Sequence, residues 1–194
     1  MAVNEPTVAP WARRPEVRIG AVVAIAIAAA FLVWLFVKHG DSSGEGAQTT
    51  VVPAITPVAA TPERLRELSV EAGHPVYWLG PQKNRTYELT RTSDDRIFVR
   101  YLPEDVEVGS DAAIYPIVGT YPFPDAYAGL QDLAKKKNEV SFTAPNGGLA
   151  VYSADRPTNV YLAFPGSDSQ IEVFDPSTGR ARELVASGRV APVR

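Results

Sequence analysis

The sequence YELTRTSDDRIFVRYL, residues 87–102, carries the clearest fold signal in this chain. Two runs rich in β-branched and aromatic residues, 87–92 and 96–102, flank the polar triplet Ser93-Asp94-Asp95. β-branched and aromatic side chains favour strands, and a short polar triplet between two such runs favours a turn. Residues 87–102 are therefore predicted to form a β-hairpin.

Strand-like segments of the same kind continue on both sides of this hairpin. They cover residues 76–79, 114–120, 140–143, 149–153, 159–164 and 171–174. Strands clustered in this way do not fit a doubly wound parallel sheet, in which strands alternate with helices. We expect an α+β fold, a single α/β sandwich domain with a largely antiparallel sheet and with the helices packed on one face.

Three helices are expected around these strands. The first begins after Thr61, a capping residue, with Pro62 in its first turn, and it ends at Gly73. The second runs to about residue 137, and the third starts at residues 175–176 and stops at Gly188. Strand, proline-bearing turn and helix thus occur twice in the same order, which indicates either a duplication or the recurrence of a common unit.

The region before this domain contains a long apolar run, Ile19–Val37, without a charged side chain. As a helix it would cover roughly 28 Å, close to the thickness of a bilayer core. Arg13, Arg14 and Arg18 precede the run, whereas Lys38 is the single basic residue close behind it. The positive-inside rule then predicts a single-pass protein of the cell membrane, with a cytoplasmic N-terminus and an extracytoplasmic C-terminal domain.

Two other interpretations of the apolar run remain open. A cleavable signal peptide would be cut near Ala28–Ala30, which would leave the apolar stretch 31–37 on the mature chain. A buried core helix would need neighbouring elements to cover it. We favour four regions: a disordered cytoplasmic tail, a transmembrane helix that contacts the lipid bilayer, a linker rich in Pro, Ala, Ser and Thr, and the domain. Their bounds are 1–17, 18–38, 39–61 and 62–194.

Composition narrows the function classes. The formal net charge is −3, so no basic field is present to attract nucleic acid. The chain has no cysteine, and an extracytoplasmic domain must then be stable without disulfides or thiolate metal ligands. No metal or cofactor is expected. The acidic segment with Glu104, Asp105, Glu107 and Asp111 matches no calcium-loop spacing and is interpreted as a solvated loop.

Candidate catalytic residues are few. His74 lies between Gly73 and Pro75, where we expect it to cap the preceding helix rather than to act as a general base. Ser167 follows a glycine but lacks the second glycine of a nucleophile elbow. A surface hydrolase that uses Ser167 or a carboxylate together with His74 is the alternative to a binding protein.

Aromatic residues supply the remaining candidates. All eight tyrosines lie in the C-terminal domain, most of them at strand positions where packing explains them. A smaller group flanks turns or prolines and supplies the candidates for an exposed site. With the single domain histidine, the predicted binding residues are His74, Tyr77, Trp78, Tyr121, Phe123 and Tyr161.

Four sequence segments of the domain carry a resemblance to a known family. They are HPVYWLGP (74–81), YELTRT (87–92), VRYLP (99–103) and VYLAFPGSD (160–168). With these strings, most of residues 70–193 resembles an uncharacterised family of single-pass membrane-anchored proteins of actinobacterial type, which has no assigned activity. The resemblance implies an anchor and a bacterial envelope location, and it transfers no site.

The sequence therefore favours a membrane-anchored extracytoplasmic module that binds a protein or a cell-envelope component. The surface hydrolase is one alternative. The second is a transmembrane signalling or assembly protein, whose cytoplasmic tail would contact a partner through Trp11, Arg13 and Arg14.

Overall fold

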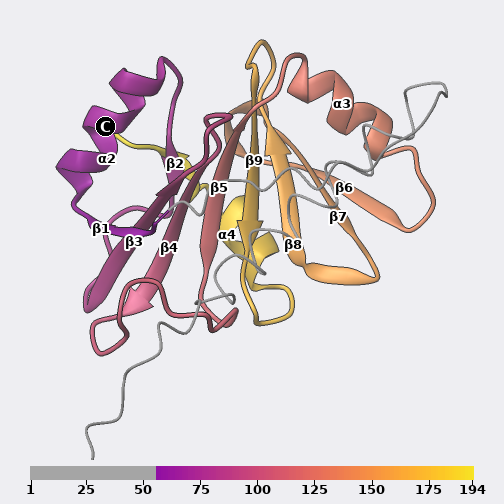
Figure 1. Ribbon diagram of the computed structural model, residues 1–194. Coiled ribbons are helices and arrows are strands. Elements are labelled where there is room, and N and C mark those ends of the chain that lie inside the picture. Colours follow the sequence, from indigo (N-terminus) through magenta and orange to yellow (C-terminus); the bar gives the residue numbers. More distant parts are fainter. Residues whose placement is uncertain (1–55) are drawn as a thin grey trace, which may run out of the picture.

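The computed structural model describes residues 56–194 as a mostly antiparallel sheet with three helices (Figure 1). The eight strands of the main sheet are β1 (Val58–Ala60), β3 (Arg85–Arg91), β4 (Ile97–Pro103), β5 (Ile117–Pro122), β6 (Glu139–Thr143), β7 (Leu149–Ser153), β8 (Arg156–Ala163) and β9 (Ser169–Phe174). The helices are α2 (Pro62–Ala72), α3 (Ala126–Leu133) and α4 (Arg180–Ala186), and η1 (Pro145–Gly147) is a short 3-10 turn. The predicted α+β class is confirmed.

The predicted tail, transmembrane helix and most of the linker lie outside the described residues. Within residues 56–194, no helix is both long enough and apolar enough to cross a membrane.

The sheet joins two meanders at its centre. Its order is β1-β3-β4-β5-β9-β8-β7-β6, and every neighbouring pair is antiparallel. The predicted hairpin 87–102 is β3 and β4, which pair from Arg85 opposite Pro103 to Arg91 opposite Ile97. The two-residue strands β2 (Tyr77–Trp78) and β10 (Ala191–Pro192) form a second, small sheet.

The helices lie on both faces of the sheet, so the expectation of helices on one face is wrong. α2 and α4 pack in the main core, which includes Val160 and Leu162 of β8. α3 packs in a separate cluster with Tyr161 and Ala163 of the same strand. Successive strand residues point to opposite faces, so α3 covers the face opposite to α4. Figure 1 shows α4 behind the sheet and α3 at the upper edge near β8.

We call the two sides of the sheet the core face and the polar face. The core face carries the side chains that pack against α2, α4 and the small sheet. The polar face carries the alternate side chains of the same strands, and among residues 56–194 α3 is the helix that packs on it. On the central strands of the polar face, α3 contacts β9, and the side chains of Tyr121, Gln170 and Glu172 are less than 5% exposed.

Local sequence explains where the first helix begins and ends. The hydroxyl of Thr61 accepts a hydrogen bond from the backbone N–H of Arg64, at 3.2 Å, as expected for an N-cap. Gly73 has a φ of 69°, the left-handed conformation that glycine adopts without steric cost. Leu65 and Leu68, which lie about one turn apart, are the buried residues of the helix.

Two boundaries differ from the expectation. Val58–Ala60 pairs with β3, so residues assigned to the linker form the edge strand of the sheet. The last helix begins at Arg180 instead of residues 175–176. The Asp175 carboxylate accepts a hydrogen bond from the backbone N–H of Ser177, and Gly179 has a φ of 82°. Asp favours turns of this kind, and the turn takes the place of the first residues of the predicted helix.

The sequence repeats a unit of strand, turn and helix, but its two copies are not placed equivalently in the fold. β5 and β9 are neighbours at the centre of the sheet, but the helices that follow them, α3 and α4, pack on opposite faces. In a symmetric duplication, a two-fold axis perpendicular to the plane of the sheet would relate the two antiparallel strands. Such an axis keeps each face of the sheet in place, so both helices would lie on the same face. The arrangement therefore favours recurrence of a common unit over a symmetric duplication.

Candidate functional site

The candidate site is built around Glu172, a carboxylate in the middle of the central strand β9. Its neighbours Ile171 and Val173 are fully buried in the main core. Because strand side chains alternate, Glu172 projects from the polar face. The register places Gly119 of β5 and Tyr161 of β8 directly opposite it.

Three side chains from two neighbouring strands donate hydrogen bonds to this carboxylate. The Tyr121 hydroxyl donates to Glu172 Oε2 at 2.5 Å, and Asn159 Nδ2 donates to Oε1 at 2.6 Å. The hydroxyl of Tyr161 donates as well. Glu172 is only 4% exposed, so these donors replace the water that a surface carboxylate would bind. We call Glu172, Tyr121, Tyr161 and Asn159 the carboxylate cluster.

Gly119 makes room for the cluster. A Cβ atom at Gly119 would lie 2.9 Å from the Tyr121 hydroxyl oxygen and 3.0 Å from two of its ring carbons. The Tyr121 ring thus runs back along its own strand, over the glycine and toward Glu172. Phe98 contacts the ring edge-on with centroids 5.5 Å apart, and the Arg96 guanidinium lies 5.9 Å from the ring centroid.

Burial controls the electrostatics of the cluster. Desolvation raises the pKa of the Glu172 carboxyl, and the hydrogen bonds from Tyr121, Asn159 and Tyr161 oppose that rise. Desolvation, followed by the nearby Glu172 charge, raises the pKa of the Tyr121 and Tyr161 hydroxyls. Both hydroxyls therefore stay protonated and act as donors, and the carboxylate is held in an environment that favours its neutral form.

Gln170 adds an unused donor to the same face. It lies two residues before Glu172 on β9 and opposite Tyr121 in the sheet register. Its side chain is 3% exposed, and within residues 56–194 its Nε2 atom has no hydrogen-bond partner. Buried polar groups are nearly always paired, so an amide donor without a partner is a group that a bound molecule could satisfy.

The predicted site residues do not gather at one place. Tyr121 and Tyr161 meet at Glu172, whereas Tyr77 and Trp78 belong to the main core. Tyr77 stacks on Phe164, and Trp78 contacts Tyr87 edge-on. Four of the candidates for an exposed site are in fact buried: Tyr77, Trp78, Tyr121 and Tyr161.

Phe123 and His74 lie elsewhere. Phe123 is half-buried and packs with the α3 cluster, next to Gly129. His74 follows α2, which packs on the core face, so it lies across the sheet from the carboxylate cluster. Its Nδ1 atom contacts the carbonyl oxygen of Pro75, and the Gly73 N–H bonds the Val70 carbonyl oxygen. His74 is therefore not the helix cap that the sequence predicts.

The predicted pairing of Ser167 with His74 gains no support from the hydrogen bonds. Ser167 Oγ accepts from the backbone N–H of Ser169, within the turn between β8 and β9. The His74 ring contacts the carbonyl oxygen of its own neighbour Pro75 through Nδ1, and its Nε2 atom has no partner among the described residues. General-base activation of a serine needs a direct hydrogen bond to the base, and none joins these two residues.

The acidic loop after β4 is attached to the sheet by a buried ion pair. Arg100 Nε lies 2.8 Å from Glu88 Oε1, and both side chains are about 5% exposed or less. Arg100 also donates to the Ser110 carbonyl oxygen at 2.6 Å, and the Gly109 N–H donates to Glu88 at 2.6 Å. The Arg100 guanidinium further lies 5.9 Å from the Tyr115 ring centroid. Glu88 and Arg100 thus hold the loop against the polar face.

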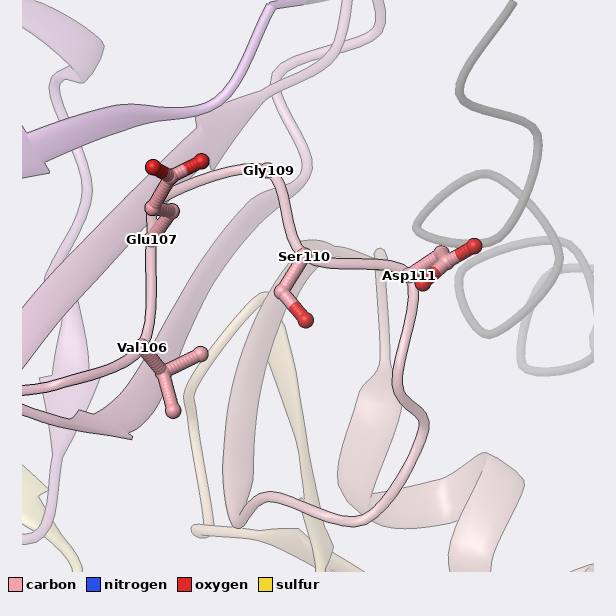
Figure 2. Close-up of a pocket in the computed structure, with 5 residues that line it drawn as sticks. All are labelled: Val106, Glu107, Gly109, Ser110 and Asp111. Carbon is pink, nitrogen blue, oxygen red and sulfur yellow. The ribbon is translucent and has the colours of Figure 1, made fainter. Parts of the chain in front are cut away.

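A cavity of about 290 Å³ lies in this loop, lined by Val106, Glu107, Gly109, Ser110 and Asp111. Figure 2 shows the side chains of Glu107 and Asp111 well apart along the loop, with Ser110 between them. Among the described residues no group of three His, Cys, Asp or Glu side chains could hold a metal ion. The cavity therefore lacks the converging carboxylates that calcium requires.

No protein-family model, curated protein or solved structure matches this chain. The candidate site thus rests on its own geometry.

Sequence reasoning missed Glu172, Asn159 and Gln170. The signal was present, since Glu172 is a charged residue between two apolar β-branched residues of a predicted central strand. Its partners became identifiable only when the register placed Tyr161 opposite Glu172 and Tyr121 opposite Gln170.

Proposed function

We propose that this chain is a membrane-anchored extracytoplasmic module that binds a protein or a cell-envelope component through the polar face of its sheet. The observation that carries the proposal is the carboxylate cluster, in which tyrosine and asparagine side chains from two strands converge on the single carboxylate of Glu172. The apolar run at residues 19–37 supports the anchor.

The chemistry of the cluster favours recognition over catalysis. Glu172 has tyrosine hydroxyls and an amide as its hydrogen-bond partners, and none of these is a base at neutral pH. Buried, oriented polar groups with a spare donor at Gln170 are typical of sites that read the hydrogen-bonding pattern of a partner. Aromatic rings with polar tips also suit glycan and protein surfaces.

Two half-buried residues extend the cluster to the surface. Asn159 and Phe174 lie on the polar face beside Glu172, and they are opposite each other in the register of β8 and β9. A partner that approaches the polar face would meet them first. They are therefore the positions at which binding can be tested without removing the core.

The test measures binding of the full chain to isolated sacculi by co-sedimentation and to envelope proteins by pull-down. We compare the natural chain with Asn159→Ala on the polar face and with Val70→Ala, an 81% exposed position on α2, as the matched control. We expect Asn159→Ala to reduce binding and Val70→Ala to leave it unchanged. A chain that is folded by circular dichroism and binds neither fraction would contradict the proposal, and so would equal binding by both variants.

A further inference from the structure

The second surface of interest is the outer edge of β6. β6 is the last strand of the main sheet, and β7 is its one neighbour among the described strands. Ser141 and Thr143 are exposed, and Val140 is 40% exposed, one of the few accessible large apolar side chains within residues 56–194. An open edge of this kind can pair with another strand.

The hydrogen bonds at both ends of β6 show which backbone groups point outward. The Ala144 N–H bonds the Gly148 carbonyl oxygen at 2.7 Å, and the Ala154 N–H bonds the Asn138 carbonyl oxygen at 2.8 Å. Hydrogen-bonded and non-hydrogen-bonded pairs alternate along an antiparallel ladder. Residues 140 and 142 therefore bond to β7.

The backbone groups of Glu139, Ser141 and Thr143 then point away from the sheet. The Glu139 N–H already bonds the Lys136 carbonyl oxygen at 3.3 Å, so its carbonyl oxygen is the group that Glu139 offers to a pairing strand. This pattern of outward residues is symmetric about Ser141, the centre of the strand.

The edge lacks the features that usually block strand pairing. β6 has the sequence EVSFT, without proline or lysine, and its residues pair with β7 in a regular register. The opposite edge of the sheet, β1, has only three residues and follows Pro57. β6 is thus the longer and less protected edge.

We propose that β6 pairs with β6 of a second copy of this chain, antiparallel and centred on Ser141. In this register Ser141 lies opposite Ser141 of the second copy, and Glu139 lies opposite Thr143. In this register, Glu139, Ser141 and Thr143 of one copy each lie opposite an outward-facing residue of the other copy. If one strand slid by two residues, one outward-facing residue on each strand would have no partner.

The side chains agree with this register. Val140 meets Phe142 of the second copy on the core face, an apolar pair, and Glu139 meets an uncharged threonine, so no like charges oppose each other. A pairing of five residues is short against the roughly 1,600 Å² of a standard interface, so the dimer is weak and depends on chain concentration.

The natural absence of cysteine makes the test direct. We introduce Ser141→Cys into the full chain, purify it in a mild detergent and oxidise it. Directly opposite residues of a hydrogen-bonded pair have Cα atoms about 5.5 Å apart, within the range of a disulfide. Thr143→Cys is the matched control, because the two copies of residue 143 would lie about 13 Å apart along the ladder.

We expect Ser141→Cys to form a disulfide dimer at least about tenfold more than Thr143→Cys, because only the first pair meets disulfide geometry. Adding Val140→Lys, which leaves the backbone unchanged, should reduce that crosslink, since the lysine would face Phe142 of the second copy. Equal crosslinking of the two cysteine variants would overturn the register. A monomer at all concentrations by light scattering, without a crosslink at residue 141, would overturn the dimer.

Discussion

Replacing Gly119 with alanine tests how tightly the carboxylate cluster is built. The new methyl group would lie 2.9 Å from the Tyr121 hydroxyl oxygen, a distance that a real Cβ atom does not tolerate. The ring has little room to move, because Phe98 and Arg96 contact it and Glu172 accepts its hydroxyl hydrogen. We therefore expect Gly119→Ala to break the hydrogen bond between Tyr121 and Glu172.

The expected loss follows from three contributions. Overpacking by a buried methyl group costs about 1–3 kcal/mol. Loss of a hydrogen bond to a charged group costs about 1.5–3 kcal/mol. Replacing glycine by alanine in an unstrained strand stabilises the fold by about 0.4–1 kcal/mol, because alanine lowers the conformational entropy of the unfolded chain. The free energy of unfolding should thus fall by roughly 2–5 kcal/mol.

The assay is urea unfolding of the full chain, followed by circular dichroism, in a double-mutant cycle with Tyr121→Ala. Without the tyrosine ring, the three atoms nearest to the methyl group at residue 119 are absent, and Gly119→Ala should be neutral or stabilising by up to about 1 kcal/mol. If Gly119→Ala destabilises the chain equally with and without Tyr121, the clash lies elsewhere and the reasoning is refuted.

Three further predictions concern stability. Burial raises the pKa of Glu172 above its ordinary 4.5, so this group stabilises the fold at acidic pH and the contribution is lost as pH rises through its folded pKa. Glu172→Gln, which does not titrate, should gain stability relative to the natural chain as the pH rises above the ordinary pKa of 4.5, measured by urea unfolding at a series of pH values. Glu88→Ala leaves the buried Arg100 charge without its partner and should cost about 3–5 kcal/mol in the same assay. Thr61→Ala removes a helix cap and should cost about 1 kcal/mol by thermal unfolding.

Each of these predictions has a result that contradicts it. A stability difference between Glu172→Gln and the natural chain that does not change with pH would show that Glu172 titrates normally in the fold. The double variant Glu88→Leu with Arg100→Met should be more stable than Glu88→Ala, and a double variant that is less stable would contradict the unpaired-charge explanation. A Thr61→Ser variant as unstable as Thr61→Ala would exclude the capping hydroxyl as the cause.

Local signals predicted the strands and the first helix well. The hairpin 87–102 and the strand 149–153 were identifiable because their β-branched and aromatic residues and the turns beside them are features of neighbouring residues alone. The Thr61 cap and the Gly73 stop are local in the same sense. β1 was missed because three residues next to prolines show no alternation that distinguishes a strand from a linker.

Neighbouring residues in the sequence could not predict which face each helix covers or where the site lies. Which face a helix covers depends on long-range packing, and α3 packs on β7 and β8 instead of on the strand it follows. Tyr121 and Tyr161 were selected for their nearby turns, but their shared partner Glu172 lies 51 residues from Tyr121. Only the order β5-β9-β8 brings the three together.

The most direct test of the proposed binding face is photocrosslinking in intact cells that express the full chain. A photoreactive phenylalanine analogue replaces Phe174, a half-buried ring on the polar face two residues from Glu172, and a control chain carries it at the exposed position Val70 on the other side of the sheet. We predict a discrete crosslinked envelope component from residue 174 that is absent from residue 70. Identical crosslinking patterns from both positions, or no product from residue 174, would contradict the account.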